Sequence, residues 1–443
     1  DEPRALHMAE VTLKAMHRGG IFDHLGGGFH RYSTDDQWLV PHFEKMLYDQ
    51  ALITTAYVEA FQATKDEEYR AAADSTFAYV LAELTGESGQ FFSGEDADSE
   101  GVEGKFYVWS EAEIDELLDA PEAELIKSHF SVESAGNFRD EATGVKTGDN
   151  ILHIKGSAPF VDAELDGIKE KLFKARAKRI RPALDDKALT DWNALMITAL
   201  SKGGSAFGDD RLVEAAVRAA SFIIENMITP DGRLLHCLRG TGSSVEGFVD
   251  DYAFFISALI DLYEANFDAK YLEIALKLQR VMIEDFWDAE NGGFFFTTKA
   301  NKDVLVRQKN FYDGAMPSGN SIALGNLFRL SRMTEEVALG ETAERLLGLF
   351  STFAAGGTLG FIQFINSAFQ LLGPAYEAVI AGKPGAKDTD DMLQAIRGEF
   401  LPGKVLIFRA ADGEKAKAYI CRDRACAQPT TDIKETLALL KSR

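Results

Sequence analysis

Apolar residues recur every three to four positions along most of the chain, a period that predicts a mainly helical protein. One set of predicted helices carries many Lys, Arg and Glu residues and should face solvent; it covers about residues 5–18, 66–84, 162–179, 209–228, 270–286 and 336–352. The other set is rich in Ala, Leu and Ser and has almost no polar face, which predicts burial; it covers about residues 44–64, 110–118, 189–203, 249–266, 314–332 and 361–372. The two sets alternate, so the pattern predicts helical hairpins.

A short glycine-aromatic segment follows several of the outer helices and marks an internal repeat of about 60 residues. It occurs as Gly89-Gln90-Phe91-Phe92, as Asp231-Gly232-Arg233-Leu234-Leu235 and as Gly292-Gly293-Phe294-Phe295. One divergent repeat with an insertion fits between residues 93 and 188. Six hairpins predict a closed (α/α)6 toroid over residues 1–372.

After residue 373 the pattern changes to short strands and turns. Strands are expected at 375–381, 404–409 and 415–421, and helices at 388–400 and 432–442. The sequence therefore predicts a small α/β extension, residues 373–443, packed on the ring.

The charge balance excludes some partners. The 47 Lys and Arg residues face 70 Asp and Glu residues, a net charge of −23, whereas nucleic acids and anionic membranes bind cationic surfaces. No apolar run reaches the roughly 18 residues of a transmembrane helix. Three cysteines do not make a disulfide framework, so we expect reduced thiols in a cytoplasmic protein. The chain starts at Asp1 without Met or a signal-type segment, which predicts a processed or truncated piece of a longer protein.

Acidic residues recur at the starts of the inner helices, at Asp49, Asp191, Asp251 and Asp313. Ring closure would gather such carboxylates in a central funnel. There they would raise one another's pKa and supply both a protonated acid and an ionised base. The competing interpretation is helix capping, since an Asp in the first turn also stabilises a helix without any chemistry.

Candidate residues for acid/base chemistry and for substrate binding come from the loops before these helices. The predicted acid/base groups are Asp49, Asp98, Asp186 and Asp251, with His30 and His42 as proton shuttles. The predicted sugar-orienting residues are Arg31, Trp38, Glu44, Trp192, Asn193, Tyr252 and Asn320. No metal or cofactor is expected: the early histidines lack metal-ligand spacing, and the calcium-like loop at Asp96 has Tyr107 at its twelfth position instead of Glu.

Long motifs resemble one known family. Gly27–Asp35, Val40–Asp49, Glu95–Gly101 and Gly104–Ser110 are similar to the spermatogenesis-associated, thioredoxin-domain-containing proteins. Further similar segments are Asp185-Asp186-Lys187, Trp192-Asn193, Asp250-Asp251-Tyr252-Ala253 and Pro317-Ser318-Gly319-Asn320. The resemblance implies a toroid similar to N-acylglucosamine 2-epimerases and six-hairpin glycosidases, and a carbohydrate-related role. It also implies a thioredoxin-like domain that this chain lacks, so no redox activity carries over.

Two hypotheses follow for function. In the first, the toroid is a carbohydrate-active enzyme, either a sugar epimerase or isomerase or a glycoside hydrolase, with a small-molecule carbohydrate as its ligand. In the second, it is a non-catalytic binding module that accompanies the thioredoxin-like domain. A common architecture does not decide between them, because one fold hosts many functions.

Overall fold

The computed structural model describes residues 2–139, 143–156, 163–240, 242, 245–302, 304–354, 357–411 and 415–442. About 52% of the chain is helical, which confirms the mainly α class. The chain divides into two compact units: Asp1–Gly86 with Phe91–Lys187, and Glu87–Gln90 with Ala188–Arg443. The predicted boundary between a ring ending at residue 372 and an extension starting at residue 373 stays a prediction.

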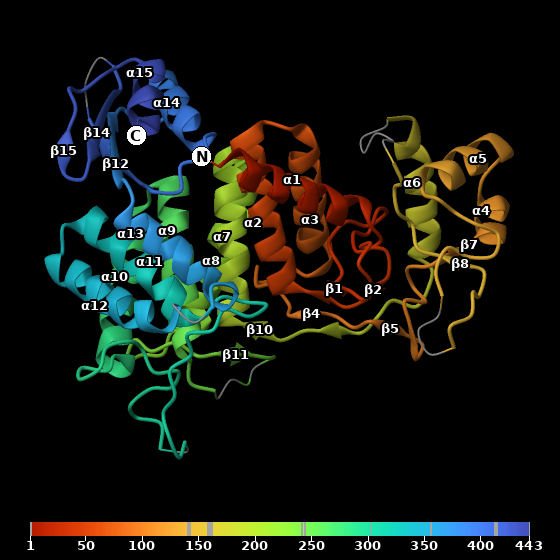
Figure 1. Ribbon diagram of the computed structural model, residues 1–443, viewed down its shortest axis with the longest axis horizontal. Coiled ribbons are helices and arrows are strands. Elements are labelled where there is room, and N and C mark those ends of the chain that lie inside the picture. Colours follow the sequence, from red (N-terminus) through yellow and green to blue (C-terminus); the bar gives the residue numbers. More distant parts are fainter. Residues whose placement is uncertain are drawn as a thin grey trace. The chain divides into compact units, whose positions relative to one another are not determined.

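The first unit is built from short helices and two-residue strands. Its helices are α1 (Pro3–Arg18), α2 (Leu47–Thr64), α3 (Glu67–Glu83), α4 (Glu111–Leu117), α5 (Ala120–His129) and α6 (Ala163–Arg176). Its strands are β1 (Tyr32–Ser33), β2 (Pro41–His42), β3 (Lys45–Met46), β4 (Gly94–Glu95), β5 (Asp98–Ser99), β6 (Val102–Glu103), β7 (Trp109–Ser110), β8 (Asp149–Asn150) and β9 (Leu184–Asp185). Helices α2 and α3 pack as an antiparallel hairpin (Figure 1). The hydroxyl of Tyr57 ties α1 to α2 by donating to the carbonyl of Leu13, at 2.7 Å.

Helices α4, α5 and α6 share a separate apolar cluster that includes Trp109, Ile126 and Leu172. This cluster occupies the stretch where the sequence predicted a divergent repeat with an insertion. The predicted capping box starts α4: the Ser110 N–H donates to the Glu113 carboxylate at 2.8 Å, and the Glu113 N–H donates to the Ser110 hydroxyl at 3.3 Å.

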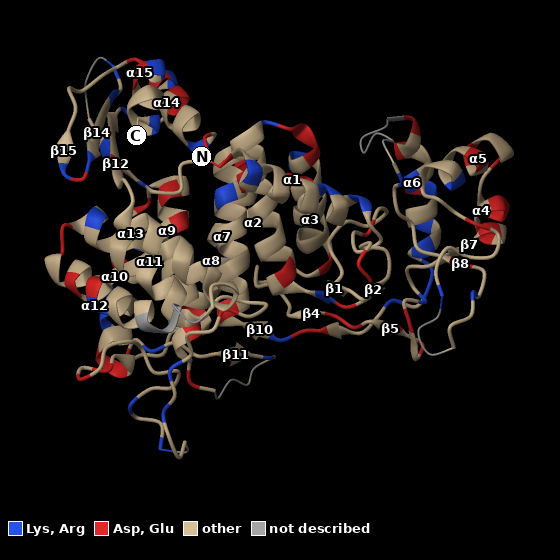
Figure 2. Cartoon of the chain, viewed as in Figure 1, with Lys and Arg blue, Asp and Glu red and all other residues tan. Residues whose placement is uncertain are grey.

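The second unit is a stack of longer helices followed by a sheet. Its helices are α7 (Thr190–Phe207), α8 (Asp210–Asn226), α9 (Val249–Asn266), α10 (Ala269–Phe286), α11 (Gly319–Thr334), α12 (Val337–Ala354), α13 (Ile362–Leu372), α14 (Lys387–Arg397) and α15 (Ile433–Lys441), with a short 3-10 turn at Leu359–Phe361. Helix α9 packs against α7, α10 and α11, and α11 also packs against α12 and α13. The predicted inner helices α7 and α9 are buried along most of their length, and α7 is tan almost throughout in Figure 2.

The strands predicted after residue 373 form one sheet. The strands of the second unit are β10 (Ala188–Leu189), β11 (Cys237–Leu238), β12 (Tyr376–Gly382), β13 (Lys404–Ala410), β14 (Lys417–Arg422) and β15 (Ala425–Cys426). The last four lie in the order β13-β12-β14-β15, with β12 and β13 parallel and the other pairs antiparallel. Helices α14 and α15 share a buried apolar cluster with this sheet, as expected for an α/β arrangement. Arg397 of α14 donates to the carbonyls of Glu264 and Ala265 at 2.7 Å, which attaches this part to α9.

The expectation of reduced thiols is wrong for two of the three cysteines. Cys421 and Cys426 form a disulfide, while Cys237 is free. Asp423 and Arg424 have φ values of 49° and 69°, the left-handed pair of a two-residue hairpin turn. This turn brings β14 and β15 together with Cys421 directly opposite Cys426.

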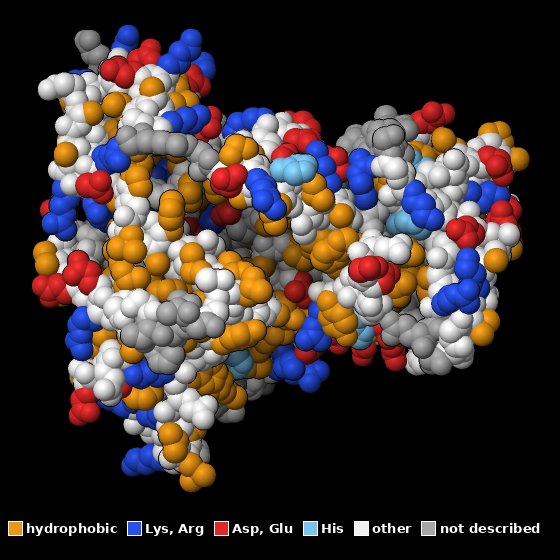
Figure 3. Space-filling view, viewed as in Figure 1, with side chains coloured by type: hydrophobic (Ala, Val, Ile, Leu, Met, Phe, Trp, Pro, Cys, Tyr) orange, Lys and Arg blue, Asp and Glu red, His pale blue; other side chains and the backbone are white. Residues whose placement is uncertain are grey.

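Helix α13 exposes one apolar face. Ile362, Ile365, Phe369 and Leu372 are exposed at helical spacing, and Figure 3 shows hydrophobic side chains gathered where α13 lies. Within the described residues, no helix combines the length and hydropathy that crossing a bilayer requires.

Two helices start later than predicted, and one helix was not predicted. Helix α2 starts at Leu47 rather than near residue 44, because the preceding residues form β2 and β3. Helix α11 starts at Gly319 rather than near residue 314, since Pro317 precedes an N-cap at Ser318. Helix α5 was not predicted, although Asp119 caps its N-terminus.

The predicted glycine-aromatic hairpins are present. Each closes with a β-bridge after an outer helix: Phe22 with Phe29, Thr85 with Phe91, Ile228 with Leu234, and Trp287 with Phe294. Gly28 and Gly293 stand at equivalent points of two of these hairpins with φ of 78°, a conformation that favours glycine.

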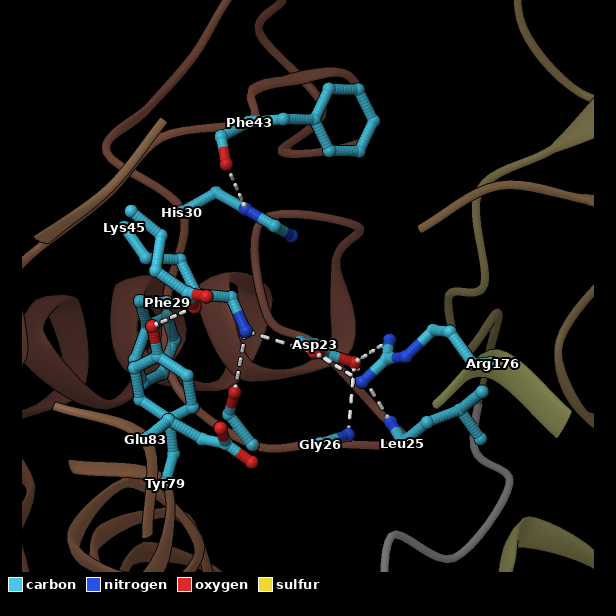
Figure 4. Close-up of polar contacts among 12 residues, drawn as sticks. Asp23, Leu25, Gly26, Phe29, His30, Phe43, Lys45, Tyr79, Glu83 and Arg176 are labelled. Carbon is cyan, nitrogen blue, oxygen red and sulfur yellow. Dashed lines mark hydrogen bonds and ion pairs between the residues drawn. The ribbon is translucent and has the colours of Figure 1, made fainter. Parts of the chain in front are cut away.

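A buried charge cluster lies under the first hairpin. Asp23 accepts from Lys45 at 2.8 Å and from Arg176 at 2.8 and 2.9 Å, and Lys45 also donates to the carbonyl of Gly27 at 2.8 Å. Figure 4 shows Lys45 and Arg176 approaching Asp23 from opposite sides. Burial alone would raise the pKa of Asp23, but the two cations hold it well below its usual range.

Asp23→Asn tests this buried cluster. The variant leaves two buried cations with no charged partner, so we expect the free energy of unfolding to fall by about 3–5 kcal/mol. Urea denaturation at pH 7 measures the change.

Asp74→Asn is the matched control, because Asp74 pairs with Arg70 at 3.5 Å on the exposed face of α3. This variant should change the free energy of unfolding by about 0.5 kcal/mol or less. Equal losses in the two variants would show that the Asp23 cluster does not stabilise the fold.

Candidate functional site

The segment from residue 41 to residue 47 alternates between buried and partly exposed positions, as an extended chain does. Phe43, Lys45 and Leu47 are buried, at 5%, 1% and 0% exposure. His42 and Glu44 therefore point to the opposite, partly exposed side. The anchoring of Lys45 inside the protein thus fixes which polar side chains are presented outside.

An outward-facing polar cluster forms around Arg31. Its Nη1 lies 2.8 Å from the Glu44 carboxylate, and its Nε donates to the Tyr48 hydroxyl at 3.0 Å. His42 lies between two carboxylates, with Nε2 at 3.3 Å from Glu44 and Nδ1 at 2.6 Å from Glu103. We call these residues, together with Asp49, the Arg31 cluster.

Asp49 is the acid of this cluster. It is the third residue of α2, and within the described residues its buried Oδ2 accepts no hydrogen bond. Burial raises the pKa of Asp49 to about 7; Arg31 opposes this rise and Glu44 adds to it. The carboxyl group is therefore divided between its protonated and ionised forms near neutral pH, which suits a group that gives and takes protons.

The surface beside this acid has an aromatic face. The Tyr32 ring stacks on the His42 ring with centroids 5.0 Å apart and planes 25° from parallel, and Tyr32 is half exposed. The cluster thus combines charged hydrogen-bonding groups with a flat apolar surface, a combination that suits a polar ligand with an apolar face.

The structure brings four of the predicted site residues into this cluster: Arg31, His42, Glu44 and Asp49. His30 is placed elsewhere. It is 2% exposed, its Nδ1 lies 3.0 Å from the Phe43 carbonyl, and burial lowers its pKa to about 3. Its ring is therefore neutral and held in the interior, so the geometry favours His42 over His30 as a proton carrier.

The other predicted residues of the first unit lie at its surface. Asp98, in β5, and Asp186, after β9, are exposed, and Trp38 is partly exposed with a left-handed φ of 61°. The roles of these three residues stay predictions.

In the second unit, Asp251 is at the centre of another cluster. It is fully buried in the first turn of α9, and its Oδ2 accepts from the Phe248 N–H at 2.7 Å. Its two oxygens lie 3.0 and 3.1 Å from Nδ1 of His236, and Oδ1 also accepts from the Asp191 N–H at 3.1 Å. We call Asp191, His236 and Asp251 the Asp251 cluster.

The groups of the Asp251 cluster shift one another's pKa values. Burial, and then the negative charge of Asp251, raise the pKa of Asp191 well above its usual range. Burial lowers the pKa of His236, but the hydrogen bond and charge of Asp251 outweigh it and raise the pKa overall. These shifts favour a protonated imidazole of His236 beside the two buried carboxyl groups.

Three predicted binding residues of the second unit form hydrogen bonds to backbone segments. Asn193 donates to the Leu189 carbonyl at 2.9 Å, and the Tyr252 hydroxyl accepts from the Leu234 N–H at 2.9 Å. Asn320 accepts from the Phe294 N–H at 2.8 Å and donates to the Phe294 carbonyl at 2.9 Å. Trp192 is partly exposed.

His236, Tyr48 and Glu103 were not among the predicted site residues. The repeat contained a signal for His236. Phe29 and Leu234 each close a hairpin through a β-bridge, and Arg31 and His236 stand two residues after them, respectively. Each is followed by an inner helix with an Asp in its first turn. Glu103 carried no such signal, since its contact with His42 joins residues far apart in sequence.

Comparison with known proteins confirms the resemblance inferred from the motifs: this chain is a relative of the spermatogenesis-associated, thioredoxin-domain-containing proteins. It is 36% identical to spermatogenesis-associated protein 20 of Homo sapiens over 498 residues, which is 99% of this chain and 63% of that protein. It is 29% identical to an uncharacterized protein of Caenorhabditis elegans over 97% of this chain and 66% of that protein. The chain thus spans less than two thirds of these relatives, and no family model matches it.

Solved structures with a similar fold include sugar-processing enzymes. The GH76 α-mannanase of Bacteroides thetaiotaomicron is 10% identical over 80% of this chain and 73% of its own, with a TM-score of 0.43. The cellobiose 2-epimerase of Spirochaeta thermophila is 12% identical over 83% of this chain and 71% of its own, with a TM-score of 0.41. At such identities and TM-scores these likenesses transfer no residue role to this chain.

The raised pKa of Asp49 makes a prediction about stability. Between about pH 4 and pH 7 the unfolded chain has lost the Asp49 proton while the folded chain keeps it, so stability falls as the pH rises. Asp49→Asn cannot ionise and should remove this decline, which is at most about 1.4 kcal/mol per pH unit. Urea denaturation at pH 4.5 and 7.5 measures the difference between wild type and variant.

Asp74→Asn serves again as control, because Asp74 is exposed. Its stability relative to wild type should stay nearly constant over the same interval. A constant difference for Asp49→Asn as well would contradict the raised pKa.

Proposed function

We propose that this chain is a carbohydrate-active enzyme that works by acid/base chemistry at the Arg31 cluster. The observation that carries the proposal is Asp49: a carboxyl group with a pKa of about 7 and a buried oxygen without a hydrogen-bond partner in the described residues, beside Arg31 and Glu44. A general acid or base is most effective when its pKa lies near the working pH.

In this proposal each residue of the cluster has a distinct part. Asp49 transfers the proton at the reacting carbon or oxygen, and His42 exchanges protons with solvent through its partly exposed ring. Arg31 and Glu44 orient sugar hydroxyls, and the Tyr32 ring supports an apolar face of the sugar.

Two reaction classes use such a site. Epimerisation or isomerisation removes a proton next to a carbonyl carbon and returns it at the same or the neighbouring carbon. The combination of an imidazole with a carboxyl group of pKa about 7 favours this class. Glycoside hydrolysis instead needs a second carboxylate as base or nucleophile, a part that Glu44 would take. Asp98, Asp186 and Asp251 stay predicted acid/base groups.

The alternative is a non-catalytic module that accompanies a thioredoxin-like domain. Asn193, Tyr252 and Asn320 favour it, because all three were predicted to bind sugar and all three instead bond to backbone atoms. In that case the Arg31 cluster would bind a metabolite or a protein without turnover.

A substrate screen separates these possibilities. Aldoses, ketoses and disaccharides are incubated in deuterated water and followed by NMR, and aryl glycosides are followed by release of the aryl alcohol. Deuterium at the carbon next to the carbonyl indicates epimerase or isomerase chemistry, whereas aryl release indicates hydrolysis. Asp49→Asn should lower kcat by about 10²–10⁴-fold, since a general acid or base contributes that much.

The pH profile and a control complete the test. The wild-type kcat/KM should change near pH 7 with the titration of Asp49. Asp74→Asn should keep full activity, because its side chain lies on the exposed face of α3. No turnover and no thermal shift over the whole panel would refute the enzymatic proposal, and a thermal shift without turnover would support the binding module.

A further inference from the structure

The Asp251 cluster has the composition of a metal site. Nδ1 of His236, one carboxylate oxygen of Asp191 and one of Asp251 all lie within 4.8 Å of one another. We propose that these three side chains bind a divalent transition-metal ion, with Zn²⁺ as the best match. The site lies within the second unit and does not involve the Arg31 cluster.

The ligand types support this assignment. Zn²⁺ accepts imidazole nitrogen and carboxylate oxygen at about 2.0–2.2 Å, and four tetrahedral ligands at that distance lie roughly 3.3–3.5 Å apart. Nδ1 of His236 is 3.0 and 3.1 Å from the two oxygens of Asp251. Small side-chain rotations therefore suffice to place these atoms around one ion.

Asp191 provides an independent sign of a missing ligand. Its side chain is buried at 5% exposure, and its Oδ1 accepts from the Trp192 N–H at 2.8 Å. Within the described residues its other oxygen accepts no hydrogen bond, although it belongs to the cluster. A buried carboxyl group whose second oxygen has no donor is costly unless a cation or a proton neutralises it.

The backbone holds the three ligands in place. The Thr190 N–H, next to Asp191, donates to the His236 carbonyl at 2.9 Å, and Cys237 pairs with Leu189 in the β10–β11 ladder. Asp251 is fixed by the Phe248 N–H, and α7 packs directly against α9. Ligands preorganised in this way lose little freedom on binding an ion.

The site also has an open side. The side chain of His236 is 24% exposed while that of Asp251 is fully buried. With three protein ligands and access past His236, the fourth position would be open to water or to a small ligand.

The competing explanation is a structural ion pair, with protonated His236 between the two carboxyl groups and no metal. It makes a different prediction, because an ion pair gives no metal-dependent signal. The test uses the full chain without a polyhistidine tag, freed of metal by a chelator and then titrated with Co²⁺ and Zn²⁺.

We expect one equivalent of Co²⁺ to give the visible absorption of a four- or five-coordinate nitrogen and oxygen site, and Zn²⁺ to displace it and raise the Tm. Asp191→Asn and His236→Gln should weaken binding by at least about 10–100-fold, the loss that even an outer-shell change can cause. His7→Gln is the matched control, because His7 is an exposed histidine of α1, and it should bind as wild type does.

Absence of the Co²⁺ spectrum in the wild-type protein would overturn the proposal, as would unchanged affinity in both ligand variants. If a variant does not fold, the wild-type spectrum decides, because a nitrogen and oxygen coordination spectrum at one equivalent requires a histidine-containing site. His129→Gln and His153→Gln then exclude the other histidines in the described part of the chain that lie outside the first 42 residues. The sugar screen does not affect this outcome, since neither Asp49 nor His42 is a ligand.

Discussion

A lysine that bonds at once to an aspartate and to a glycine carbonyl holds two of the glycine-aromatic hairpins, one in each unit. Lys45 bonds to Asp23 and to the carbonyl of Gly27. In the second unit, Lys309 bonds to Asp288 at 2.7 Å and to the carbonyl of Gly292. Two parts of the chain thus use the same device, because a hairpin with two left-handed glycines exposes carbonyls that need a donor.

This contact decides which side chains reach the surface. With Lys45 directed inward, the alternation of the extended chain turns Glu44 outward beside Arg31, and α2 then starts with Asp49 in its first turn. The helix dipole favours an ionised Asp49, yet burial outweighs it and raises the pKa of Asp49 to about 7. An acid suited to proton transfer therefore results from a backbone constraint and partial burial, and needs no unusual residue.

The sequence predicted the helices and hairpins well because they depend on local periodicity and on glycine. It predicted less of the site, because residues of the same type differ in burial, and their burial depends on the folded structure. His30 and His42 look alike in a sequence, but His30 is 2% exposed and His42 bridges two carboxylates. The disulfide was missed for a similar reason. Pairing of Cys421 with Cys426 depends on the left-handed turn between them, and the residue types at Asp423 and Arg424 do not predict that turn.

The two clusters place a cation at the same step of the repeat, but the cations differ in chemistry. Arg31 stays charged at every accessible pH, so its ion pair with Glu44 does not depend on its own protonation. A neutral His236 offers Nδ1 as a ligand atom close to the carboxylates of Asp191 and Asp251. A metal ion can therefore replace the proton of His236, whereas nothing can replace the charge of Arg31. In our two proposals, the same backbone framework serves proton transfer in one unit and metal binding in the other.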